Sequence, residues 1–137
     1  MRAAVVFAEG QRHERLLSLS KSLARGLIAQ GHQVDVINAT RQSESKLTIY
    51  QYIAVGSEGT TFITGKLPEA VHRFLKGSGA VSGKRCYAFI AKGRSGYRRA
   101  LLRLMQVMER EGMYLKNSGV LASDAEAEAV GKRLHLE

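Results

Sequence analysis

The chain has 137 residues, enough for one domain with a buried core, and 45% of them are hydrophobic, which argues against intrinsic disorder. No apolar run is long enough to cross a bilayer, and the first residues lack the pattern of a signal peptide, so we expect a cytoplasmic protein. The formal net charge of +9 favours an anionic partner, such as an acidic protein, a phosphate or a nucleic acid, but a basic surface that serves only solubility explains it equally well.

In the first half of the chain, apolar residues alternate between strand-like and helix-like spacing. Residues 2–8 predict a strand, and residues 14–30 predict a helix that Gly31 ends. A second strand is expected at 34–37, whereas residues 39–48 are too polar for more than a loop or a short helix. The apolar positions of the first helix are Leu16, Leu17, Leu19, Leu23, Ala24, Leu27 and Ile28.

The second half of the chain continues the same alternation. Pro68 suits the first turn of a helix that ends at Gly77 and Gly79, and Ser123 or Asp124 suits the N-cap of the last helix. Strands separated by helices predict a mostly parallel sheet with helices on both faces, in one domain over residues 1–137. The strands are expected at 50–56, 84–91 and 114–121, and the helices at 68–77, 98–111 and 124–135.

Three short turns follow strand-like runs, at residues 8–13, 56–61 and 92–97. If the sheet is parallel, all three turns leave it at the carboxyl ends of strands, which is where open parallel sheets bind ligands. We therefore expect the functional site to be built from these turns.

Four segments resemble the flavodoxin-like family, in the same order along the chain. Residues 52–57 are similar to its third strand and Gly-Ser turn, 67–75 to the Pro-led helix that follows, 83–89 to the Gly-Lys lead into the fourth strand, and 100–113 to the next helix with its closing Gly-Met. The resemblance covers nearly the whole chain. It implies a three-layer α/β/α domain with a five-stranded parallel sheet in the order 2-1-3-4-5.

The resemblance also implies non-covalent binding of flavin mononucleotide (FMN). In that family the first turn surrounds the phosphate, and the second and third turns flank the isoalloxazine ring. Tyr97 and Phe62 are the candidates for stacking on the ring. Carried over by position, the cofactor-binding residues are Glu9, Gly10, Gln11, Arg12 and His13 in the first turn, Ser57, Glu58, Gly59, Thr60 and Thr61 in the second, and Lys92, Gly93, Arg94, Gly96 and Tyr97 in the third.

The first turn departs from the family pattern because it has no Ser or Thr hydroxyl. It offers instead Gly10, the amides at the start of the first helix, and the cations Arg12 and His13. Helix amino termini bind anions, and an Arg can add a bidentate contact to phosphate. The alternative is that Glu9 and Glu14 only favour the start of the helix while Arg12 is solvated.

The third turn departs from the pattern by its charge. Flavodoxin electron carriers tend to be acidic around the ring, whereas the densest group of cations in this chain falls at this turn: Lys92, Arg94, Arg98 and Arg99. A change of one charge near the ring is worth about 1–4 kcal/mol at close range. We therefore expect a higher flavin reduction potential than in a low-potential carrier, and an acidic redox partner.

Other chemistries find little support in the sequence. The four His residues are dispersed, and the single Cys, Cys86, falls in an expected buried strand, so we predict a core residue and no metal site. There is no Gly-x-x-x-x-Gly-Lys loop and no Gly-x-Ser-x-Gly elbow, which makes a hydrolase a poor candidate. RNA-binding motifs with paired surface aromatics are absent, so we do not expect sequence-specific binding of nucleic acid.

Two function classes remain. One is an FMN-binding redox protein, either an electron carrier or a small oxidoreductase. The other is a flavodoxin-like domain that has lost FMN and recruits an acidic partner through its basic surface.

Overall fold

The computed structural model describes residues 1–8, 13–58, 68–79, 81–93 and 95–137. The strands of this part of the chain all pair in parallel, in the order β2-β1-β3-β4-β5, which confirms the expected topology. The described elements are β1 (Arg2–Phe7), α1 (His13–Ala29), β2 (Gln33–Asn38), β3 (Tyr52–Ser57), α2 (Glu69–Gly77), β4 (Arg85–Ala91), α3 (Tyr97–Arg110), β5 (Tyr114–Leu121) and α4 (Asp124–Arg133).

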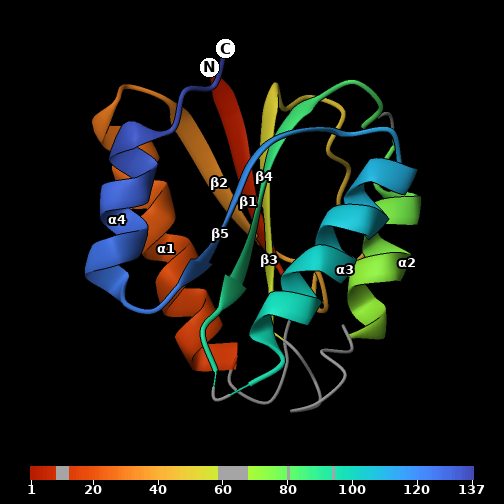
Figure 1. Ribbon diagram of the computed structural model, residues 1–137. Coiled ribbons are helices and arrows are strands. Elements are labelled where there is room, and N and C mark those ends of the chain that lie inside the picture. Colours follow the sequence, from red (N-terminus) through yellow and green to blue (C-terminus); the bar gives the residue numbers. More distant parts are fainter. Residues whose placement is uncertain (9–12, 59–67, 80, 94) are drawn as a thin grey trace.

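The helices cover both faces of the sheet, with α1 and α4 on one face and α2 and α3 on the other (Figure 1). The central strands β1, β3 and β4 are therefore buried on both sides, which explains why they are almost continuously apolar. Alternate residues of these strands supply two separate cores, one beneath each helix pair. The two chain termini lie together at the edge where the strands begin (Figure 1).

The α1 and α4 helices approach each other at two glycines. A Cβ atom added at Gly26 would lie 2.2 Å from the carbonyl oxygen of Glu128, and one added at Gly131 would lie 2.3 Å from that of Leu23. Only glycine permits this backbone separation.

The α4 helix starts with Ser123 as its N-cap, as predicted. The Oγ of Ser123 accepts a hydrogen bond from the backbone N–H of Glu126 at 3.2 Å.

A few sequence expectations differ from the structure in detail. Ile28 is 52% exposed, because it points away from the sheet although its neighbour Leu27 is fully buried. β3 begins at Tyr52 rather than at residue 50, and Tyr50 belongs to the preceding turn. Pro68 is the N-cap of α2 and precedes its first turn.

The single cysteine, Cys86, is buried in β4, which confirms the prediction of a core residue.

In the described part of the chain, no helix combines the length and apolar character that crossing a membrane requires.

Candidate functional site

The ends of β1, β3 and β4 lie side by side, and we call this rim of the sheet the carboxyl edge (Figure 1). The backbone N–H of Ala8, just after β1, donates to the carbonyl of Gly56 in β3 at 3.3 Å. The N–H of Lys92, just after β4, donates to the carbonyl of Leu121 at 2.9 Å. The sheet therefore brings the starting points of the three predicted turns together, as the parallel topology requires.

The first turn leads into the amino end of α1 at this edge. The helix begins at His13, and Glu14 in its first turn is exposed. The first amides of a helix lack intrahelical partners and carry a partial positive charge, so this helix end suits an anion. The predicted binding residues Glu9, Gly10, Gln11 and Arg12 lie outside the described residues, and their role stays a prediction.

The described part of the second turn is buried. Ser57 is fully buried, and its Oγ donates to the carbonyl of its neighbour Glu58 at 3.3 Å. Glu58 itself is only 8% exposed, so the carboxyl edge carries a nearly buried acidic residue among its cations. The predicted residues Gly59, Thr60 and Thr61, and the stacking candidate Phe62, lie outside the described residues.

The third turn places Tyr97 at the start of α3. Gly96 is the N-cap of that helix and adopts φ +77°, a left-handed conformation that glycine allows at little cost. Tyr97 is half-buried and packs against the core beneath α2 and α3. No atom of the described residues lies within 4 Å of a Cβ atom added at Gly93, so this part of the chain leaves the backbone there accessible. Lys92 is exposed, and Arg94 lies outside the described residues.

Arg15 belongs to this edge but was not among the predicted residues. It reaches from α1 and donates to two backbone carbonyls, that of Lys92 and, at 3.1 Å, that of Ala122. It therefore ties the third turn to the connection between β5 and α4. The sequence could have indicated this role, because Arg15 is a long basic side chain in the first turn of a helix that directly follows the end of a strand.

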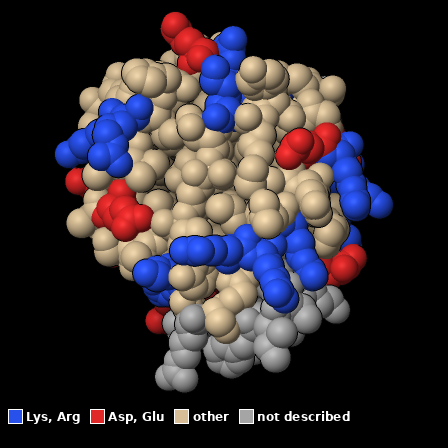
Figure 2. Space-filling view, viewed as in Figure 1, with Lys and Arg blue, Asp and Glu red and all other residues tan. Residues whose placement is uncertain are grey.

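The carboxyl edge is rich in positive charge. Figure 2 shows Lys and Arg side chains gathered across the lower part of the molecule, beside the ends of the strands. At this edge Arg15 is half-buried as a residue, and Lys92, Arg98 and Arg99 are exposed. Among the described residues, no group of three or more His, Cys, Asp or Glu is arranged to hold a metal ion.

This geometry defines a doubly wound parallel α/β protein in which the ends of β1, β3 and β4 lie at one edge of the sheet. No protein-family profile and no curated protein sequence matches the chain. Solved structures of flavodoxins do match it, at low sequence identity and over nearly the full length of both chains.

Three of these structures illustrate the likeness. An archaeal flavodoxin is 21% identical, with a TM-score of 0.73 over 96% of this chain and 94% of that one. Oxidised flavodoxin 1 from Bacillus cereus is 17% identical, with a TM-score of 0.75 over 98% and 100%. Two-electron reduced flavodoxin from Megasphaera elsdenii is 14% identical, with a TM-score of 0.72 over 95% and 96%. The protein has the flavodoxin-like fold, in a divergent sequence.

Proposed function

We propose that this protein binds FMN non-covalently at its carboxyl edge and acts in the cytoplasm as a redox protein, either an electron carrier or a small oxidoreductase. The observation that carries the proposal is the convergence of the three strand ends with the amino end of α1 at one edge. The fold neighbours include flavodoxins described as oxidised and as two-electron reduced, and they span nearly the whole chain.

The described residues suit such a ligand in three respects. The amides at the start of α1 suit the phosphate, with Arg12 as the expected additional cation. The open backbone at Gly93 suits a polar ring edge, and the part of Tyr97 that its packing leaves exposed suits the ring face. When bound, FMN supplies reversible transfer of one or two electrons, while the chain binds and orients it.

The positive charge of the carboxyl edge leads us to expect a particular reduction potential for the bound flavin and a particular kind of redox partner. Cations near the ring lower the free energy of the anionic reduced flavin relative to the oxidised form, and thereby raise the reduction potential. Arg15, Lys92 and Arg98 supply that charge, and the nearly buried Glu58 opposes it. We infer a potential above that of acidic flavodoxins and a redox partner with an acidic docking surface.

A second candidate function is a flavin-free interaction module for an acidic partner. It is favoured by Ser57, whose hydroxyl is buried and donates to the adjacent carbonyl of Glu58. The packing of Tyr97 against the core also gives that residue a structural role without FMN. In this case the cations of the carboxyl edge would attract the partner directly.

Reconstitution distinguishes the two candidates. The purified protein is mixed with excess FMN and desalted, and its visible spectrum and flavin fluorescence are recorded. Retained flavin absorbance with quenched fluorescence would support the redox protein. A redox titration of the bound FMN would then test whether its reduction potential is higher than that of acidic flavodoxins. Loss of all FMN on desalting, together with no heat of binding in calorimetry, would reject that function and favour the interaction module.

A further inference from the structure

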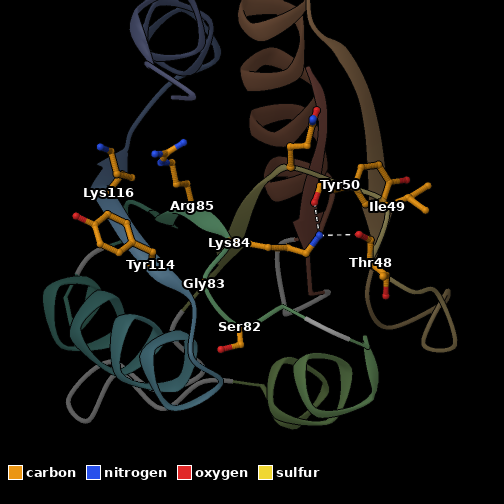
Figure 3. Close-up of a pocket in the computed structure, with 10 residues that line it drawn as sticks. Thr48, Ile49, Tyr50, Ser82, Gly83, Lys84, Arg85, Tyr114 and Lys116 are labelled. Atoms are coloured by element: carbon orange, nitrogen blue, oxygen red, sulfur yellow. Dashed lines mark hydrogen bonds between the residues drawn. The ribbon is translucent and has the colours of Figure 1, made fainter.

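A hollow of about 730 Å³ lies at the opposite rim of the sheet, where the strands begin. We call it the amino-edge hollow. Its walls are residues 48–51 before β3, residues 82–85 at the start of β4, and Tyr114 and Lys116 of β5 (Figure 3). It is open to solvent, so it suits a segment of another molecule lying across it more than an enclosed small ligand.

The charged side chains that line this hollow are all basic: Lys84, Arg85 and Lys116. The ammonium group of Lys84 has a structural task, since it donates to the carbonyl of Thr48 at 2.6 Å and to that of Tyr50 (Figure 3). Arg85 and Lys116 are exposed, and within the described residues neither forms an ion pair. Two positive charges therefore face the hollow without a protein counter-charge in that part of the chain.

Apolar surface accompanies these charges. Ile49 is 58% exposed on one side of the hollow, and Tyr114 is 59% exposed on the other. The Lys116 ammonium lies 5.7 Å from the centroid of the Tyr114 ring, a cation–π arrangement that holds both side chains at the rim. Exposed Arg, Tyr and aliphatic side chains together are typical of protein interfaces.

The edge strand β5 adds backbone groups to this surface. It is the last strand in the sheet order, and within the described residues its outer side has no strand partner. An exposed strand edge offers unpaired N–H and C=O groups to an extended segment. Tyr114 and Lys116 are the residues where this edge borders the hollow.

We propose that the amino-edge hollow docks an extended acidic segment of a partner protein, with carboxylates at Arg85 and Lys116 and an apolar side chain between Ile49 and Tyr114. A second copy of this chain is a poor occupant, because it would bring the same net charge of +9. Nucleic acid is disfavoured because, among the described residues that line the hollow, Tyr114 is the one exposed aromatic, whereas proteins that bind single strands stack successive bases on several aromatic side chains.

This surface is separate from the carboxyl edge. The strands between them are about 20 Å long, as six or seven residues at about 3.3 Å each imply. An acidic partner docked at the hollow therefore leaves the carboxyl edge accessible. The proposal does not depend on FMN, so the protein is tested without it.

The test uses a fluorescein-labelled peptide of twelve alternating Glu and Val residues. Its controls are the same peptide with Gln in place of Glu, and a labelled twelve-nucleotide oligouridine. Anisotropy measures binding, and ¹H–¹⁵N spectra of the protein locate it. The Arg85→Glu/Lys116→Glu variant is compared with Lys21→Glu/Arg103→Glu, which makes the same charge change at exposed positions on α1 and α3. Circular dichroism checks that both variants are folded.

We expect spectral changes confined to residues 48–51, 82–85 and 114–116. The affinity for the acidic peptide should fall about tenfold in Arg85→Glu/Lys116→Glu but less than twofold in Lys21→Glu/Arg103→Glu. Equal weakening in both variants would overturn the proposal, because it would show only attraction to net charge. Changes centred on Lys92 and Arg98 would overturn it by placing the acidic segment at the carboxyl edge. Tighter binding of oligouridine at the hollow would overturn it in favour of nucleic acid, and no binding of the acidic peptide would overturn it outright.

Discussion

The ring of Phe89 lies over the Cα atom of Gly56, its register partner in the adjacent strand, so closely that a Cβ atom at Gly56 would be 2.1 Å from Phe89 Cζ. Tyr87 stacks on Phe89 with 6.1 Å between ring centroids. In the same way, a Cβ atom at Gly119 of β5 would lie 2.6 Å from the Tyr87 hydroxyl oxygen. The aromatic residues of β4 thus fill the space that glycines leave on both neighbouring strands, directly beneath the carboxyl edge.

Gly56→Ala is therefore expected to destabilise the fold. The added methyl group must displace a fully buried ring, and overpacking of this kind costs about 1–3 kcal/mol of unfolding free energy or more. Urea unfolding measures the loss. Gly93→Ala is the matched control, because its methyl group meets no atom of the described part of the chain within 4 Å and should change stability by less than about 0.5 kcal/mol. The double variant Gly56→Ala/Phe89→Leu should recover part of the lost stability, because the smaller side chain leaves room for the methyl group. A Gly56→Ala protein as stable as the original would contradict this packing argument.

Arg15→Ala is expected to loosen the third turn. The substitution removes the hydrogen bonds to the carbonyls of Lys92 and Ala122, at a cost of about 1 kcal/mol because the contacts are partly solvated. Amide hydrogen exchange should become faster at Lys92, whose N–H is protected by the carbonyl of Leu121. Arg25→Ala is the control. Arg25 also belongs to α1, and its substitution removes an exposed ion pair with Glu128 of α4, away from the third turn. Unchanged exchange at Lys92 in Arg15→Ala would show that the arginine does not hold the turn.

Stability should fall in alkaline solution, in part through Tyr50. Burial, together with the 2.7 Å hydrogen bond that its hydroxyl donates to Asp35, raises the pKa of Tyr50 to about 12. Because the pKa in the folded state lies above the ordinary value of 10.0, this contribution is fully present below pH 10 and is lost as the pH rises toward 12. Because the Asp35 side chain is exposed and solvent screens part of the interaction, we expect a contribution of about 1–2 kcal/mol to the unfolding free energy.

Urea unfolding between pH 9 and pH 12 checks this prediction. The original protein should lose stability over this range relative to Tyr50→Phe, which has no hydroxyl to ionise at this position. Burial also raises the pKa of Tyr87 to about 12, but that residue is present in both proteins, so the comparison isolates Tyr50. Tyr114→Phe, at an exposed tyrosine, should follow the original protein. Parallel pH profiles for Tyr50→Phe and the original protein would refute the prediction.

If FMN binds as proposed, Tyr97→Ala should weaken it about tenfold, through loss of about 1–1.5 kcal/mol of aromatic stacking. Fluorescence titration with FMN measures the change. Tyr114→Ala removes a tyrosine at the opposite rim of the sheet and should leave FMN affinity unchanged. Tyr97→Phe should retain affinity, because the ring and not the hydroxyl is required. Equal FMN affinity in Tyr97→Ala and the original protein would place the ring elsewhere.

Much of the fold was predictable from the sequence because its signals are local. The leucines of α1 recur at helical spacing, and the apolar runs of β1, β3 and β4 are typical of strands buried on both faces. The turns at the carboxyl edge could be predicted as a site for the same reason, since they follow those runs. Their use for FMN came from a family resemblance and remains a prediction, as most residues of the first two turns lie outside the described part of the chain.

The sequence by itself therefore determined which segments are helices and strands and that the sheet is parallel, and it predicts a ligand site at the carboxyl edge. Only the tertiary structure decided that Phe89 takes the place of a side chain at Gly56, that Arg15 reaches Lys92 across 77 positions, and that Arg85 and Lys116 meet in one hollow. The physical reason is that periodicity and turn chemistry act between neighbours in the chain, whereas these contacts join residues that only the sheet register and helix packing bring together.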